Sequence, residues 1–273
     1  MIEIEILGLG AWGRHFGSWS ELSHGLNSGE WPDSSPLAPG LLPPAIRRRA
    51  PMSVKMAIEV MQQACTMANL EPAQLATVYC SSMGDMELTD RICRTLSEDP
   101  KLTSPTHFHN SVHNAATGYW TMATTVRRPA TAISAFGHST AISLLEAASQ
   151  TVFEETPVLL VSGEVQAPMT LQFACPTQSP FAAALILAPP DSNAMPFANL
   201  NICLEDGEAD TIRVKGLPNR LGEVPDACLL SALAALSSLD SDNRSTILRY
   251  AVSKSMHLRA EFSLPETENK PRA

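Results

Sequence analysis

The residues with the clearest chemical potential form one short turn, Gly137-His138-Ser139-Thr140-Ala141, between an apolar run and a helical pattern. The turn nearly matches G-x-S-x-G, in which a sharp strand-to-helix bend exposes a nucleophilic serine above a sheet. A triad would also need a downstream acid and histidine, and the candidates are Asp226 or Asp240 and His257. A tight turn needs small residues for steric reasons alone. The small residues of the turn therefore do not by themselves indicate a nucleophile. A serine hydrolase or acyltransferase that uses Ser139 is kept as the alternative.

A second group combines three histidines with two asparagines: His107, His109, Asn110, His113 and Asn114. His109 and His113 stand four residues apart and would share one helix face, as paired zinc ligands do. No glutamate lies between them to act as general base, and no third ligand is evident. We therefore expect packing or hydrogen-bonding roles here, and we predict neither a metal site nor a cofactor.

A glycine-rich segment, Gly8-Leu9-Gly10-Ala11-Trp12-Gly13, matches the letters of the dinucleotide-binding motif G-x-G-x-x-G. Isoleucine alternates with glutamate over residues 2–6, which predicts a half-exposed strand just before the motif. The motif should open a helix, but glycine, serine and proline follow it instead. We therefore expect a glycine-permitted turn rather than a nucleotide site.

The charge balance bears on partners. The chain has 28 acidic and 19 basic residues, a net charge of −9. Nucleic-acid binders usually show a basic excess, so that class is not favoured. Arg47, Arg48 and Arg49 form the one concentrated cationic segment of the sequence. It could dock an acidic partner such as a phosphopantetheine carrier, or it could be a solvated loop.

Strand and helix patterns alternate through the first two thirds of the chain, which predicts an α/β layered fold. Strands are expected at 77–81, 130–136, 157–162 and 181–188, and helices at 53–68, 85–98, 105–125 and 140–152. After Pro189-Pro190 the sequence becomes polar and weakly periodic, apart from a helix at 226–239 and a frayed tail of about a dozen residues. We therefore expect one domain over residues 1–190 and a C-terminal appendage over 191–273.

The cysteines and the apolar runs bear on location. The six cysteines, at 65, 80, 93, 175, 203 and 228, form no C-x-x-C pair, so neither zinc nor a disulfide framework is expected. No apolar run approaches the roughly 18–20 residues of a membrane helix. The N-terminus lacks the basic segment of a signal peptide. These features predict a cytoplasmic protein without a membrane span.

Several segments together carry a family resemblance. Residues 104–118 resemble the pattern S-P-x-x-F-x-x-S-V-x-N-x-x-A-G, and residues 47–60, 131–143, 158–164 and 181–188 resemble further segments of the same family. The family is the β-ketoacyl synthases, and the match is to their N-terminal half. The resemblance implies a thiolase-like layered fold over about residues 1–190, with only the N-terminal half of a synthase present.

The resemblance also implies a departure from catalysis. It places the position of the family's catalytic cysteine at Gly137, or one residue to either side at Phe136 or His138, and none of these is cysteine. Condensation needs a thiolate to hold the acyl group, and the chain ends too soon to build the family's second half. The chain therefore resembles chain-length factors, in particular the small N-terminal-only subunits of aryl polyene pathways.

A chain-length factor pairs with an active β-ketoacyl synthase, and through that complex with an acyl carrier protein. In thiolase-fold dimers the nucleophile strand pairs with its counterpart, and the 105–120 segment lines the partner's acyl tunnel. The residues that the resemblance places there are Phe108, Val112, Asn114, Thr117 and Tyr119. The rival hypotheses are the Ser139 hydrolase and a free-standing acyl-carrier or acyl-CoA binding module.

Overall fold

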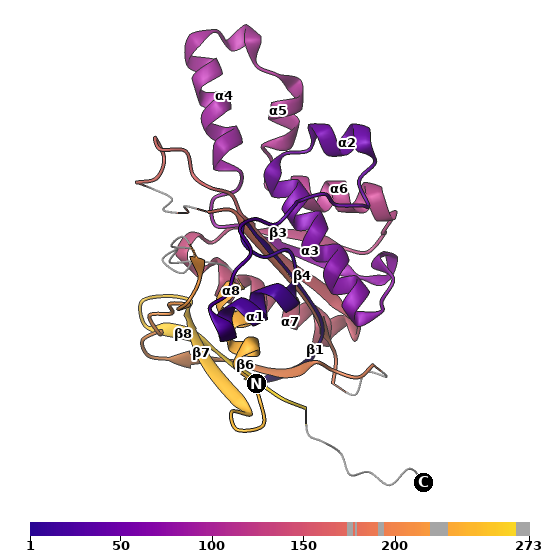
Figure 1. The fold of residues 1–273 in the computed structure, drawn as a ribbon, viewed down its shortest axis with the longest axis vertical. Coiled ribbons are helices and arrows are strands. Elements are labelled where there is room, and N and C mark those ends of the chain that lie inside the picture. The colour runs from indigo at the N-terminus through magenta and orange to yellow at the C-terminus, as the bar shows by residue number, and fades with distance from the viewer. Residues whose placement is uncertain (174–176, 178, 191–193, 219–228, 266–273) are drawn as a thin grey trace.

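One mixed eight-stranded sheet forms the centre of the fold (Figure 1). The computed structural model describes residues 1–173, 177, 179–190, 194–218 and 229–265. The strand order is β3-β2-β4-β5-β1-β6-β8-β7, with β3, β2 and β4 parallel and the other neighbours antiparallel. The strands are β1 Ile2–Gly13, β2 Ala76–Cys80, β3 Ala130–Ile133, β4 Val158–Glu164, β5 Phe181–Ala188, β6 Ala198–Asp206, β7 Ser245–Ala251 and β8 Met256–Ser263. The predicted α/β layered fold is confirmed.

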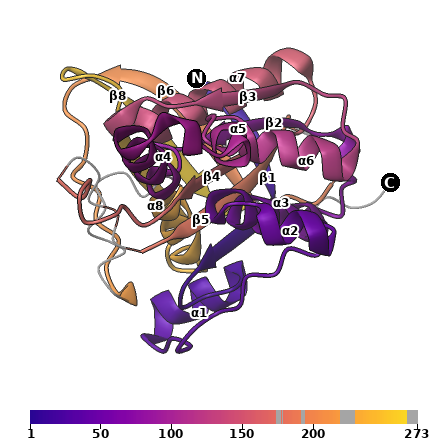
Figure 2. The same cartoon turned by 90° about the horizontal axis from the view of Figure 1, so that it is seen from above.

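Helices cover both faces of this sheet. On one face lie α3 (Met52–Ala68) and α6 (Ala115–Thr124), which Figure 2 shows side by side. On the other face α7 (Ser139–Glu154) packs with α8 and α1. The other helices and 3-10 turns are α1 Trp19–Ser28, α2 Pro44–Arg49, η1 Pro72–Gln74, α4 Met86–Glu98, η2 Pro100–Leu102, α5 Pro105–Asn110, η3 Phe136–His138 and α8 Leu230–Ser237. Within the described ranges, none of the helices is long and apolar enough to cross a membrane.

The glycine-rich motif lies inside a strand, so the predicted turn is wrong. β1 continues to Gly13 and pairs with β5 along the whole motif. A Cβ on Gly8 would collide with the carbonyl oxygen of Ala64, and a Cβ on Gly10 with that of Val60, both on α3. The glycines therefore let a helix and a strand approach closely. This role for the glycines replaces the nucleotide-binding interpretation.

Gly10→Ala is expected to destabilise the fold by at least about 2 kcal/mol, because the new methyl group overlaps helix backbone that cannot rotate away. The matched control is Gly118→Ala in α6, where no atom lies within 4 Å of the new Cβ. That change should stabilise the protein by about 0.5–1 kcal/mol through helix propensity. Urea unfolding of both variants measures the two effects. Equal stability of the two variants would contradict the close packing of β1 on α3.

The predicted helix over 105–125 is two helices. α5 ends at Asn110, and α6 begins at Ala115. At the break, both the backbone N–H and the hydroxyl of Ser111 donate to the carbonyl oxygen of Phe108. Such a local side-chain bond competes with the helical ladder. Together α4 and α5 project beyond the sheet as a helical arm (Figure 1).

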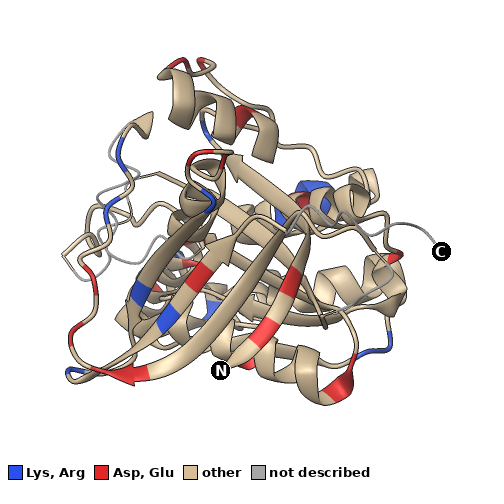
Figure 3. Cartoon of the chain, turned by 90° about the horizontal axis from the view of Figure 1, so that it is seen from below, with Lys and Arg blue, Asp and Glu red and all other residues tan. Residues whose placement is uncertain are grey.

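The C-terminal part contributes more than the single predicted helix. β6, β8 and β7 extend the central sheet beyond β1. The predicted helix over 226–239 is α8, which begins at Leu230 and ends at Ser237. The three strands bury one face against α7 and α8 and carry charged residues on the other (Figure 3). Within the predicted tail, residues 266–273 lie outside the described residues.

Candidate functional site

The turn between β3 and α7 has the shape of a nucleophile elbow. Phe136 has a φ of +47°, a left-handed conformation that bulky residues rarely adopt. The backbone then turns through η3 directly into α7. Such a strained strand-to-helix bend is where nucleophile-elbow enzymes expose the nucleophile. In this chain the residue at the strained position is phenylalanine.

Ser139 is a structural residue of this elbow. Its side chain is fully buried. Its hydroxyl oxygen accepts a hydrogen bond from the Ala135 N–H at 3.0 Å, and the hydroxyl donates to the Phe136 carbonyl at 2.7 Å. With its proton bound to a carbonyl and its oxygen out of solvent, Ser139 cannot attack a substrate in this conformation.

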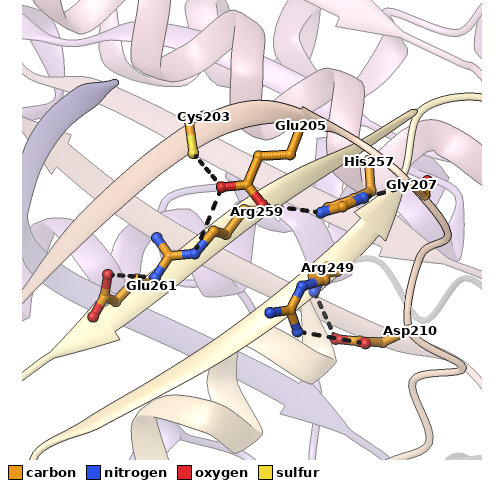
Figure 4. Close-up of polar contacts among 8 residues, drawn as sticks. All are labelled: Cys203, Glu205, Gly207, Asp210, Arg249, His257, Arg259 and Glu261. Atoms are coloured by element: carbon orange, nitrogen blue, oxygen red, sulfur yellow. Dashed lines mark hydrogen bonds and ion pairs between the residues drawn. The ribbon is translucent and has the colours of Figure 1, made fainter. Parts of the chain in front are cut away.

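The proposed triad partners of Ser139 are engaged elsewhere. The imidazole of His257 on β8 has its Nε2 3.3 Å from a Glu205 carboxylate oxygen and its Nδ1 3.4 Å from the Gly207 carbonyl (Figure 4). The Asp240 carboxylate accepts from two backbone N–H groups of its own turn. Asp226 lies outside the described residues. Nothing in the described chain therefore assembles a triad around Ser139.

The described cysteines offer no activated thiol at the elbow. Cys80, at the end of β2, is buried and its thiol donates to the Ser139 carbonyl at 3.4 Å. Burial, with a smaller contribution from Glu71, raises the pKa of Cys65 to about 12. Burial and the hydrogen bond to Glu205 raise the pKa of Cys203. Because the thiolate is the nucleophile, these environments disfavour reactivity.

A buried carboxylate fixes the loop beside the elbow, and the sequence analysis did not single it out as a site residue. Glu164, at the end of β4, accepts from the Ser82 N–H at 2.5 Å and from the Ser81 hydroxyl at 3.2 Å. The Ser134 hydroxyl in turn donates to the Ser82 carbonyl at 2.8 Å. These bonds link the ends of β2 and β4 and the segment that follows β3. A glutamate that ends an apolar strand was the signal for it.

β3 is an edge strand. Within the described part of the chain it pairs with β2 alone. Ala130 and Ala132 on β3 have small, exposed side chains, and Ser134 and Phe136, which follow the strand, are also exposed. An unpaired edge can add a strand from another chain.

The predicted tunnel residues divide into two groups. Phe108 and Val112 are 66% and 48% exposed on the arm side, and Asn114 is also exposed. Thr117 and Tyr119 are buried in the chain's own core, and the Tyr119 hydroxyl donates to the Asn110 side chain at 3.0 Å. The break between α5 and α6 separates the two groups. Only the first three are therefore available for contact with another molecule.

The arginine segment forms the end of α2, where the sequence allowed a solvated loop. Arg48 and Arg49 line a cavity of about 550 Å³ between α2, α4 and α5. Arg91 and His107 add positive or titratable groups to this cavity. The acidic groups in the cavity are Asp85 and Glu87. The Asp85 carboxylate accepts hydrogen bonds from the Ser53 hydroxyl and the Leu88 N–H. Glu87 forms an ion pair with Arg91. The Arg47 guanidinium donates to the Pro39 carbonyl.

The histidines of the second group point to different places. The rings of His113 and Tyr79 pack edge to face with 6.3 Å between their centroids, and burial lowers the pKa of His113. His107 faces the arginine cavity, and His109 is exposed. No three His, Cys, Asp or Glu side chains of the described residues are grouped to hold a metal ion.

Comparisons with known proteins identify the family and the fold. The family model described as "Beta-ketoacyl synthase, N-terminal domain" matches residues 18–224. A structure of a ketosynthase in complex with its chain length factor from Xenorhabdus doucetiae is similar, with a TM-score of 0.66, 21% identity, and 96% of this chain and 100% of that chain covered. Among curated protein sequences, none matches this chain.

Two further solved structures share the fold. The ishigamide ketosynthase/chain length factor matches with a TM-score of 0.72 at 13% identity, covering 97% of this chain and 99% of that chain. A type II polyketide synthase acyl-carrier protein in complex with its ketosynthase bound to the hexaketide matches with a TM-score of 0.73 at 12% identity, with the same two shares covered. At these identities the likeness shows a common fold.

Proposed function

We propose, from the premise that this chain belongs to the β-ketoacyl synthase N-terminal domain family, that it is a non-catalytic, chain-length-factor-like subunit. It would pair with an active β-ketoacyl synthase, stabilise it and shape its acyl tunnel. The finer proposal is a role in aryl polyene or related fatty-acid-like synthesis, as the sequence resemblance implies.

One observation carries the non-catalytic role. The elbow has a strained backbone of the kind that presents a nucleophile, yet the three positions to which the resemblance assigns the family's cysteine, Phe136, Gly137 and His138, supply no thiol or hydroxyl. Decarboxylative condensation needs a group that can hold the acyl chain as a thioester. An elbow that retains its shape without its nucleophile favours a partner role over an independent enzyme.

The free edge of β3 supports the proposal that this chain pairs with a synthase. By analogy with thiolase-fold dimers, the synthase would add its own nucleophile strand to this edge and merge two sheets. Phe108, Val112 and Asn114 would then face the partner's tunnel, because they are the exposed members of the predicted set. Thr117 and Tyr119 would support them from behind.

Carrier docking is a further part of the proposal. The cavity lined by Arg48 and Arg49 would receive the acidic surface or phosphopantetheine group of an acyl carrier protein that serves the pair. We also propose that the pair works in the cytoplasm, since Cys65, Cys93 and Cys203 are free thiols.

The test compares three samples: the chain alone, a ketosynthase from the same genome that co-purifies with it, and the two together. With acyl- and malonyl-loaded carrier protein, the chain alone should form no condensation product, and the pair should be active. A fluorophosphonate probe should leave Ser139 unlabelled, because its hydroxyl is buried. Condensation by the chain alone, or labelling that Ser139→Ala abolishes, would overturn the proposal.

A further inference from the structure

Phe136 combines two features that are each unfavourable in a separate chain. Its backbone lies in the left-handed region, where a side chain crowds the carbonyl. Its ring is 63% exposed to solvent. Gly137, which would tolerate the left-handed conformation without strain, is the very next residue and does not have a positive φ. The chain therefore places a large ring where the backbone disfavours it.

The surrounding structure holds the backbone of Phe136 in this conformation. Ser139 binds both sides of the turn, at the Ala135 N–H and the Phe136 carbonyl. The His138 imidazole reaches the Ala251 carbonyl at the end of β7 at 3.0 Å. The Ser134 hydroxyl bonds the loop after β2. Contacts from α7, β7 and the β2 loop thus fix a strained residue whose side chain points away from the core.

The position of the ring indicates what covers it. Phe136 lies in η3, three residues beyond Ile133, the last residue of the edge strand β3. The exposed side chains of Ala130 and Ala132 on this strand are small and allow another chain to approach closely, and the ring lies just beyond the end of the strand. Rigid aromatic side chains beside such a surface are the usual anchors of protein interfaces.

We propose that the Phe136 ring is an anchor of the subunit interface, which inserts into an apolar pocket of the synthase that pairs with β3. This rests on the proposed function and adds a specific contact to it. A residue next to Gly137, where the resemblance places the family's nucleophile, would then contribute to binding instead of catalysis.

The test uses two substitutions that suit a left-handed backbone but remove the ring, Phe136→Gly and Phe136→Asn. Both should leave the melting temperature of the separate chain unchanged or raised, because strain is relieved or accommodated. Both should weaken binding to the purified synthase by at least about 30-fold in calorimetry.

The control is Phe153→Ala, which removes a ring 85% exposed on α7 and about 21 Å along the helix from Ser139. It should bind within about twofold of the native chain.

The outcomes separate this inference from the proposed function. If the native chain binds the synthase and both Phe136 variants bind equally well, the anchor is wrong and the partner role stands. If either variant lowers the melting temperature by several degrees, the ring supports its own chain, and the anchor is again wrong. If the native chain binds no ketosynthase, the proposed function fails, and the anchor fails with it.

Discussion

Ala132→Pro is expected to separate this chain from its synthase while leaving its own fold intact. In a parallel ladder the N–H and C=O groups of one residue point to the same side of the strand, and the side alternates from residue to residue. The carbonyls of Pro129 and Ile133 accept from Thr77 and Ser81 of the β2 side. Pro129, Ile133 and the residue midway between them therefore face β2. The alternate residues, including Ala132, direct their N–H groups to the free edge.

Proline at this position removes an outward donor and places a ring in the path of an incoming strand. The residue before it, Thr131, is already extended, as the position before proline prefers. We expect binding to weaken by roughly 2–4 kcal/mol, because one edge bond is lost and its neighbours are displaced. The chain's own melting temperature should change little.

The measurement is co-purification and calorimetric titration with the synthase, alongside thermal unfolding of the separate chain. Ala132→Ser is the matched control, because it keeps the N–H and adds only a small hydroxyl. It should bind almost as well as the native chain. Native affinity in Ala132→Pro would show that the partner does not pair with β3.

The parts of the fold that the sequence predicted well are those in which burial is continuous. β4 and β5 are buried at every position and stand out as apolar runs. α3 shows its buried face at helical spacing. The family resemblance over the first two thirds, which the family model confirms, extended this pattern to the elbow.

The missed features depend on neighbours that a single sequence does not show. The pattern of Gly8 and Gly10 is compatible with a turn and with a strand. Only the close approach of α3 shows that the strand is the correct interpretation. β6 buries Ala198, Leu200 and Ile202 but alternates them with polar residues. That period of two was present in the sequence, but it was obscured by the surrounding polar residues.

The candidate site shows the same division. The resemblance predicted the family's nucleophile position at Gly137 or a neighbouring residue, but it could not show that Phe136 has a positive φ. The G-x-S-x-A letters suggested a nucleophile, and the hydrogen bonds of Ser139 instead show a residue that locks the turn. Backbone angles and hydroxyl partners are tertiary properties, so motif letters alone leave them open.

The second large effect is expected at Val112. Val112→Trp should shorten the products of the synthase complex by one or more elongation steps. Val112 is 48% exposed beside the break between α5 and α6, so a larger side chain can extend outward without displacing the chain's own core. On the proposed arrangement it extends toward the end of the partner's acyl tunnel.

The expected shortening follows from burial. Each methylene that enters an apolar tunnel contributes about 0.8 kcal/mol. An indole ring in that space removes the contribution of the last carbons, and it makes further growth of the chain sterically unfavourable. Mass spectrometry of products from the purified complex, at native complex yield, measures the length.

Val152→Trp is the matched control, because Val152 is 44% exposed on α7, away from the arm. This substitution should leave product length unchanged. If Val112→Trp and Phe108→Trp both give native lengths in an intact complex, this surface does not reach the tunnel, and the chain supports its partner without setting the product length.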